Sequence, residues 1–239
     1  MSGRAHPAGE WPLAWARRCG VVLGVLASTL SPPALAGTQR EEDLSDAVRA
    51  ALRATLAQAS EAPPTNAAPT DPAQAAWLQR VHPLFTRELQ KRRGAGTPGR
   101  MAHELDAPGL RLDFLRTVWY ESRRAGLDPD LVLGLIEVES GWRKFAVSHA
   151  GARGYMQVMP FWPRVLAQGD PASLFDLQVN LRFGCVILRH YLSLEKGDLA
   201  LALGRYNGSR GQMAYPRAVL AAQKQWARDA GPLAGGAGS

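Results

Sequence analysis

The sequence has little cysteine, and this already limits the class of protein. Only two of the 239 residues are cysteines, Cys19 and Cys185, whereas 46% of the residues are hydrophobic. A chain of this length with this apolar content can bury a core large enough to fold without disulfide staples. A disulfide framework is therefore excluded, and the apolar content also excludes a wholly disordered protein.

Long hydrophobic runs are lacking as well. The longest uncharged apolar stretch, residues 19–30, has 12 residues, whereas a membrane anchor needs roughly 20. Arg17 and Arg18 precede the stretch, and Ala34 and Ala36 follow it at the spacing of a cleavage site. This order predicts a signal peptide over residues 1–36 and export to the periplasm or cell envelope, without stable membrane insertion. Cleavage would leave Cys185 as the single thiol.

Patterns that would hold a metal or a nucleotide are also missing. The five histidines and the remaining cysteine show no metal-ligand spacing. No glycine-rich phosphate loop follows a strand, and no Ser/His/Asp pattern stands out. The sequence therefore predicts neither a metal nor a cofactor.

Positive charge, in contrast, is abundant and unevenly spread. The net charge is +6 on residues 108–228, zero on residues 37–107 and +7 on the whole chain. A basic surface favours an anionic partner, such as nucleic acid, acidic lipid or an acidic polymer. Arginine supplies 24 of the 28 basic residues, so genome composition is an alternative origin of the excess.

Residues 37–107 have the composition of an Ala/Pro-rich helical and linker region. An amphipathic helix is expected over residues 41–59, because apolar residues recur there at a spacing of four. A proline-rich linker follows over residues 61–72, and a second helix, weakened at Pro83, is expected over residues 73–91. Residues 94–99 form a flexible break. Whether these two helices dock on the next domain stays open. The apolar stripe of the first is Leu44, Val48, Leu52 and Leu56; that of the second is Trp77, Val81, Leu84, Phe85 and Leu89.

Residues 108–228 predict one mostly α domain, followed by a flexible tail over residues 229–239. A first helix is expected over residues 110–125, ending at Gly126, and a second over residues 128–140, capped by Asp128. A short helix is expected near residues 160–166. Further helices are expected to begin at Asp176, Asp198 and Tyr215, and no long stretch alternates like a strand.

One carboxylate stands out in the second of these helices. At 100° per residue, Glu139 falls between Leu135 and Val132, inside the apolar stripe, whereas Glu137 falls on the opposite side. One explanation is that the helix face reaches solvent or an arginine partner at this point. The other is that Glu139 is a carboxylic acid buried among apolar side chains. Such burial would raise its pKa, which a general acid at neutral pH requires.

Four blocks in this order resemble the lytic transglycosylases with a goose-type lysozyme-like catalytic domain. Each block resembles a motif of that family, and four together at the expected spacing are much more specific than any one. The blocks are Glu139-Ser140-Gly141-Trp142; residues 148–160, SHAGARGYMQVMP; Phe175-Asp176 with Asn180 and Gly184; and residues 203–208, LGRYNG.

The resemblance implies an enzyme that cleaves peptidoglycan glycan strands. It would cut the β-1,4 bond between N-acetylmuramic acid and N-acetylglucosamine and leave a 1,6-anhydromuramic end. Glu139 would be the single acid and base, in place of the usual two carboxylates. Ser148, Gln157 and Tyr206 correspond to family positions that bind the muramoyl N-acetyl group or orient the catalytic acid. Asn207 accompanies Tyr206.

Some of these residues have simpler explanations. The resemblance places Met159 in a sugar subsite, but it could equally be a core methionine, and Tyr206 could be a core aromatic. The sequence also departs from the family pattern at Trp142, Tyr155 and Arg205, of which Arg205 would add charge beside the cleft. Tyr215 resembles a residue of the final helix in one subgroup and would border the cleft.

Two other functions compete with this interpretation. A hydrolytic muramidase would cut the same bond with water, and a non-catalytic glycan-binding or DNA-binding module would use only the basic surface. The export signal argues against a nucleic-acid partner. Protein partners are not indicated.

Overall fold

The structure is a computed structural model that describes residues 39, 46–57, 71–94, 104–167 and 169–228, all within one compact unit, residues 32–239. The predicted signal peptide and the tail lie outside the described residues, as do most of the predicted linker and Leu44. The described elements are α1 (Asp46–Ala57), α2 (Pro72–Gly94), η1 (Glu104–Asp106), α3 (Pro108–Arg124), α4 (Pro129–Ser140), α5 (Phe161–Ala167), η2 (Pro171–Phe175), α6 (Leu177–Leu194), α7 (Leu199–Asn207) and α8 (Ala214–Trp226).

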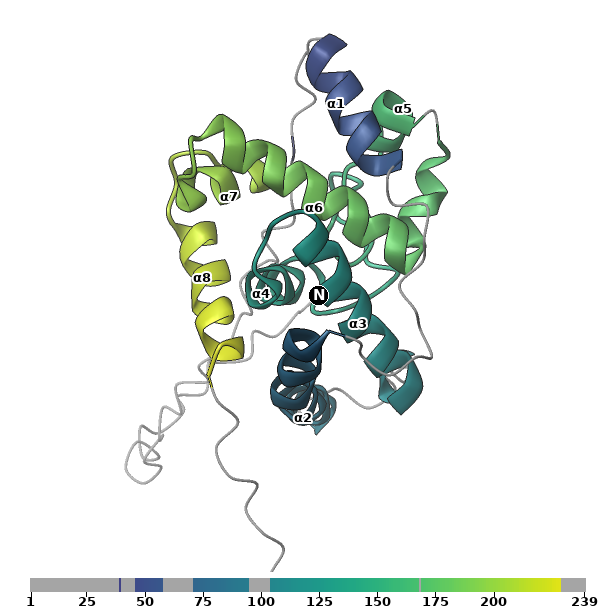
Figure 1. The fold of residues 1–239 in the computed structure, drawn as a ribbon, viewed down its shortest axis with the longest axis vertical. Coiled ribbons are helices and arrows are strands. Elements are labelled where there is room, and N and C mark those ends of the chain that lie inside the picture. Colours follow the sequence, from purple (N-terminus) through teal and green to yellow (C-terminus); the bar gives the residue numbers. More distant parts are fainter. Residues whose placement is uncertain (1–38, 40–45, 58–70, 95–103, 168, 229–239) are drawn as a thin grey trace, which may run out of the picture. The chain divides into compact units, whose positions relative to one another are not determined.

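The predicted mostly α class is confirmed (Figure 1). In the described part of the chain, β-structure is limited to two isolated antiparallel bridges, which pair Arg153 with Val147 and with Val158. No helix in this part is both long enough and apolar enough to cross a membrane.

The predicted helix starts are confirmed by their caps. The side chains of Asp128, Asp176 and Asp198 accept hydrogen bonds from the backbone N–H groups of Asp130, Val179 and Leu201. Each cap satisfies a donor that the first helical turn leaves without a partner. The helix α4 ends at Gly141, whose φ of 57° is the left-handed conformation that favours glycine.

The helix that carries Glu139 lies against two others. Figure 1 shows α4 end-on with α8 on one side and α3 on the other, and α4 packs closely against both. The approach to α8 depends on Gly134, because a Cβ there would come within 2.7 Å of the backbone nitrogen of Gln223. The absence of a side chain at Gly134 therefore allows α4 and α8 to approach this closely.

The two helices from the low-complexity region pack on the rest of this unit. The apolar stripe of α1 is buried at Leu52 and Leu56, and α1 contacts α5 and α6. The stripe of α2 is buried too, except that Leu84 is only partly covered. The α2 helix continues through Pro83 and is tied to α4, where Asp130 accepts from the Trp77 indole at 2.7 Å and from Arg80 at 2.8 Å.

Candidate active site

Glu139 lies in the last turn of α4 and is buried, with 2% of its surface exposed. The Tyr215 hydroxyl on α8 donates a hydrogen bond to its Oε1 at 2.5 Å. An apolar helix face that has simply reached solvent is therefore excluded. The carboxyl group is held inside the protein, with a phenol as a neutral donor beside it.

Two tyrosines surround this carboxylate. Burial raises the pKa of both Tyr206 and Tyr215 well above the usual value, and the negative charge of Glu139 raises them further. Both phenols therefore keep their protons at neutral and moderately alkaline pH. The Tyr206 hydroxyl donates to the backbone oxygen of Met156 at 2.8 Å, which links the tyrosine to the loop of the second motif.

That loop is held in shape by glycines and by a buried asparagine. Gly151 and Gly154 have φ values of 86° and 76°, in the left-handed region that favours glycine. The Asn180 side chain accepts from the Met156 N–H at 2.8 Å and donates to the carbonyl oxygens of Arg153 and Leu174. Asn180 of the third motif thus holds the loop of the second motif in place by hydrogen bonds.

Gln157 also holds the loop through its side chain. It is 1% exposed, and its amide donates to the backbone oxygens of Ala146 at 3.1 Å and Gly154 at 2.9 Å. Its predicted contact with substrate stays a prediction, but the described contacts of its carboxamide are internal.

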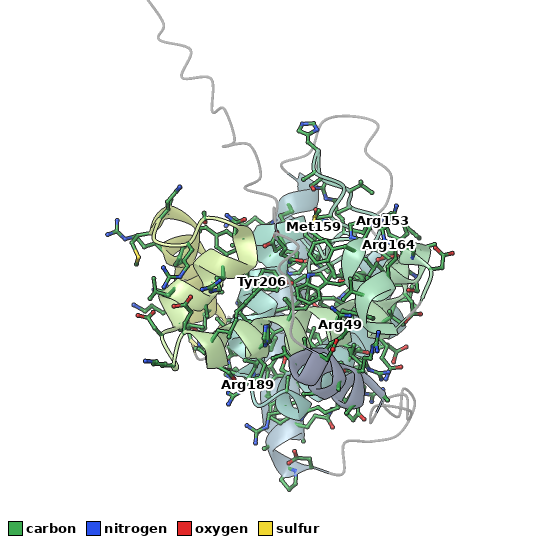
Figure 2. The ribbon with its side chains drawn as sticks, turned by 90° about the horizontal axis from the view of Figure 1, so that it is seen from above. Arg49, Arg153, Met159, Arg164, Arg189 and Tyr206 are labelled. Atoms are coloured by element: carbon green, nitrogen blue, oxygen red, sulfur yellow. The ribbon has the colours of Figure 1, made fainter. Side chains whose placement is uncertain are left out.

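The remaining predicted site residues differ in where they lie. Met159 is partly buried against the core at the end of the loop. Figure 2 labels Met159 and Tyr206 together with Arg153 and Arg164. The contacts described for Ser148 and Asn207 are local, to the Ala152 N–H and to Ser209 at 3.0 Å each. The structure thus brings Glu139, Tyr206 and the backbone of Met156 together, whereas the contacts described for Ser148 and Asn207 are within their own loops.

The three departures from the family pattern have structural partners. Trp142 is fully buried among aromatic rings, with centroids 5.0 Å from Phe85 and 5.7 Å from Trp226. The Tyr155 hydroxyl donates to Glu104. Arg205 donates to Glu195 at 2.5 Å, a carboxylate that it shares with Arg210.

Sequence reasoning missed Gln39, which is buried against this loop. Its side-chain oxygen accepts from the Met159 N–H and from the Trp162 indole, and its amide donates to the Gln157 carbonyl. A lone glutamine almost 120 residues from the loop carries no sequence signal for this position.

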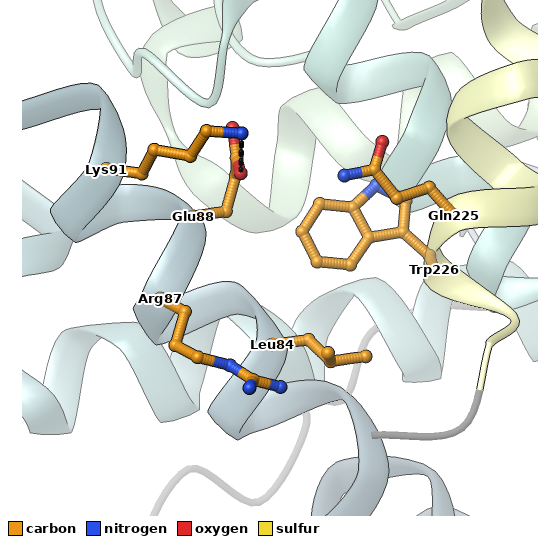
Figure 3. Close-up of a pocket in the computed structure, with 6 residues that line it drawn as sticks. All are labelled: Leu84, Arg87, Glu88, Lys91, Gln225 and Trp226. Atoms are coloured by element: carbon orange, nitrogen blue, oxygen red, sulfur yellow. Dashed lines mark ion pairs between the residues drawn. The ribbon is translucent and has the colours of Figure 1, made fainter. Parts of the chain in front are cut away.

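A surface pocket lies elsewhere, between α2 and α8 (Figure 3). It is lined by Leu84, Arg87, Glu88, Lys91, Gln225 and Trp226, and none of these belongs to the four motifs. Nor do the described residues contain a group of three or more His, Cys, Asp or Glu side chains that could hold a metal ion. The residues that line this pocket are therefore different from those predicted for the site.

Residues 117–227 match the model of one protein family, described as the transglycosylase SLT domain. The predicted resemblance to lytic transglycosylases is thereby confirmed for these residues.

Individual relatives share parts of this sequence. The chain is 47% identical over 83 residues to membrane-bound lytic murein transglycosylase C of Actinobacillus pleuropneumoniae serotype 5b, covering 31% of this chain and 23% of the relative. It is 33% identical over 101 residues to the transglycosylase of Enterobacteria phage PRD1, covering 42% of this chain and 37% of the relative. The chain therefore spans about a quarter of the length of the first relative and just over a third of the second.

Among solved structures, an inactive mutant of the lytic transglycosylase Slt from Pseudomonas aeruginosa aligns with a TM-score of 0.40 at 18% identity. That alignment covers 64% of this chain and 28% of the other.

Proposed function

We propose that this protein is a peptidoglycan lytic transglycosylase that uses Glu139 as its only acid and base. The family match supports the reaction class. The observation that carries the assignment of Glu139 is its buried carboxyl group with the Tyr215 hydroxyl at 2.5 Å. The substrate is the β-1,4 bond between N-acetylmuramic acid and N-acetylglucosamine.

The reaction needs one carboxyl group for two proton transfers. Protonated Glu139 gives its proton to the glycosidic oxygen as the bond from that oxygen to C1 of the muramoyl residue breaks. The ionised carboxylate then takes the proton of the C6 hydroxyl of the same residue as O6 bonds to C1. The product is a 1,6-anhydro ring, no water is consumed, and Glu139 ends protonated as it began.

The surroundings of the other nearby carboxylates agree with a single acid and base. Glu137 accepts from Arg92 at 2.5 Å and from the Trp226 indole at 2.8 Å, on the opposite side of α4. Asp176 is occupied as the cap of α6. These two carboxylates in the motif region thus have structural partners, and an intramolecular attack by the C6 hydroxyl needs no second one.

The tyrosines and the loop assist this chemistry. Tyr215 orients Glu139 and stabilises its charged form after the first proton transfer. Tyr206, whose pKa is raised by the nearby charge of Glu139, is assigned the role of stabilising the positive charge that develops at C1 and the acetamido group. Ser148, Gln157, Met159 and Asn207 complete the proposed sugar-binding set.

The proposal extends to the organisation of the whole chain. Residues 1–36 direct export, residues 37–107 precede the catalytic domain, and the lysozyme-like domain over residues 108–228 acts on glycan strands in the periplasm or cell envelope. The charge of +6 on that domain suits a polymer whose peptide stems carry carboxylates.

The test is the turnover of peptidoglycan by the purified full chain and by Glu139→Gln. The variant keeps the shape of the side chain but cannot transfer a proton, so turnover falls by at least about 100-fold. Glu137→Gln, the same change two residues away, is the matched control. It removes a structural ion pair with Arg92 but no group proposed to transfer a proton, so turnover of the folded variant stays within about threefold of the native chain. Unchanged turnover in Glu139→Gln would overturn the assignment.

A further inference from the structure

Gln39 is the one described residue between the chain start and α1, and its side chain is 3% exposed. The oxygen Oε1 accepts from the Met159 N–H at 3.2 Å and from the Trp162 indole at 3.0 Å. The nitrogen Nε2 donates to the Gln157 carbonyl at 3.4 Å. Both ends of the carboxamide are therefore hydrogen-bonded to the motif loop or to the start of α5.

The groups that hold this carboxamide are suited to an amide in general. A backbone carbonyl and a backbone N–H, two residues apart, present an acceptor and a donor to one amide, and an indole N–H adds a second donor. An acetamido group also has a carbonyl oxygen that accepts and an N–H that donates, with one N–H where the carboxamide has two. Both sugars of the proposed substrate carry an acetamido group.

The position is close to the proposed acid. Gln39 and Glu139 both lie near enough to Tyr206 to shift the pKa of its hydroxyl, Glu139 upward through its charge and Gln39 downward. Gln39 and Glu139 thus both adjoin Tyr206. An amide held where Gln39 lies is within the proposed sugar-binding region and not at a remote surface.

The loop does not supply partners for these two backbone groups itself. Its own hydrogen bonds pair Arg153 with Val158 and join the Gln157 N–H to Gly154. Among the described residues, Gln39 is the hydrogen-bond partner of the Gln157 carbonyl and of the Met159 N–H.

The next described element is anchored beside the same helix. Arg53 of α1 donates to the backbone oxygens of Val165 at 2.9 Å and Leu166 at 3.1 Å, near the end of α5. Trp162, which donates to Gln39, lies at the start of α5. Gln39 and Arg53, which both precede the proposed catalytic domain, therefore each contact α5. Of the two, Gln39 places an amide against the motif loop.

From this arrangement we infer that Gln39 is an internal competitor for an acetamido group of the glycan. The inference rests on the proposed function of the site. A glycan must displace the Gln39 carboxamide before its own amide can bind the Gln157 carbonyl and the Met159 N–H. Apparent affinity then depends on the fraction of molecules in which Gln39 has left the position, so Gln39 is an autoinhibitory contact.

Binding of N-acetylglucosamine tetramer to the full chain, measured by calorimetry in a Glu139→Gln background, tests this inference. Gln39→Ala removes the competitor. Gln39→Glu keeps its size but places a carboxylate oxygen against the Gln157 carbonyl. Both variants are expected to lower Kd about fivefold or more, the effect of one net hydrogen bond of about 1 kcal/mol. Gln79→Ala, the same change at an exposed position of α2, leaves Kd unchanged.

The possible results separate the two proposals. Equal or weaker binding by both Gln39 variants, with Tm unchanged, overturns the competitor role and leaves the proposed reaction standing. Weaker binding together with a fall in Tm assigns Gln39 a supporting role in the loop, which also overturns it. If the chain containing Glu139 does not degrade peptidoglycan and the tetramer does not bind, the proposed function itself fails.

Discussion

Glu137 and Glu139 lie two residues apart on α4, and their surroundings give them different roles. Burial is the main effect that raises the pKa of Glu137, while Arg92 and the Trp226 indole act in the opposite direction. These partners come from α2 and α8, so Glu137 ties three helices together. Glu139, on the other side, has the phenol of Tyr215 as its described partner. The same residue type thus serves packing at one position and, as proposed, chemistry at the other.

At the scale of the residue, Tyr215→Phe tests whether the phenol positions Glu139. The change removes one hydrogen bond to a buried carboxylate and little volume. Loss of a hydrogen bond to a charged group is worth about 1.5–3 kcal/mol, so kcat is expected to fall about tenfold or more. The basic limb of the pH profile of kcat moves to higher pH, because the hydroxyl no longer stabilises the carboxylate form.

The pH profile distinguishes positioning from general damage. Tyr120→Phe on α3 is the matched control and leaves both kcat and the basic limb unchanged. A Tyr215→Phe enzyme with a lower Tm and an unshifted pH profile would mean that Tyr215 supports the fold only.

At the scale of elements, the contact of α4 with α8 depends on Gly134. A Cβ at this position would come within 2.7 Å and 3.1 Å of backbone atoms of Gln223 and Ala222, which cannot rotate away. Gly134→Ala is therefore expected to cost about 1–3 kcal/mol of unfolding free energy by overpacking. Thermal unfolding measures the effect.

The matched control for this change is Gly109→Ala at the start of α3. A Cβ there would meet nothing within 4 Å, and alanine favours a helix over glycine. The control is expected to leave Tm equal or slightly higher. A Tm of Gly134→Ala as high as that of the native chain would contradict the close helix contact.

The end of α6 is joined to α7 and the residues after it by Glu195. Hydrogen bonds from Arg210, and next from Arg205, lower the pKa of this carboxyl from 4.5 to about 2. The unfolded chain therefore takes up a proton at a higher pH than the folded chain does. The stability that this group contributes is fully present above pH 4.5 and is lost as the pH falls toward about 2.

Glu195→Gln tests this linkage. Urea unfolding measured between pH 2 and pH 6 should show a shallower loss of stability in acid for the variant than for the native chain. Asp176→Asn is a control at another helix end, because asparagine caps a helix about as well as aspartate. Equal acid dependence in native chain and Glu195→Gln would refute the contribution of this ion pair.

At the scale of the whole molecule, the sequence predicted the features that depend on local chemistry. Aspartate caps, proline in the first turn and glycine at helix ends act within a few residues, so the starts of α4, α6 and α7 were predictable. The position of Glu139 in an apolar stripe followed from helical periodicity alone. Tyr206 near Glu139 followed from the motif, because the family pattern encodes the tertiary arrangement.

Features that depend on partners distant in the sequence were not predictable. The attachment of Gln39 to residues 157–162 joins segments nearly 120 residues apart, and no periodicity marks it. The role of Asn180 under the loop is equally non-local. The sequence left open whether α1 and α2 dock, because an amphipathic stripe indicates burial but not the surface that buries it.

The proposed cleavage of the glycan consumes no water, and the mass of the products tests this directly. Intact peptidoglycan is digested with the purified full chain, and the released muropeptides are weighed by mass spectrometry. We expect 1,6-anhydromuropeptides, each lighter by one water than the hydrolysed product, and none from Glu139→Gln. Products at the hydrolysed mass would identify a muramidase and contradict the proposed reaction.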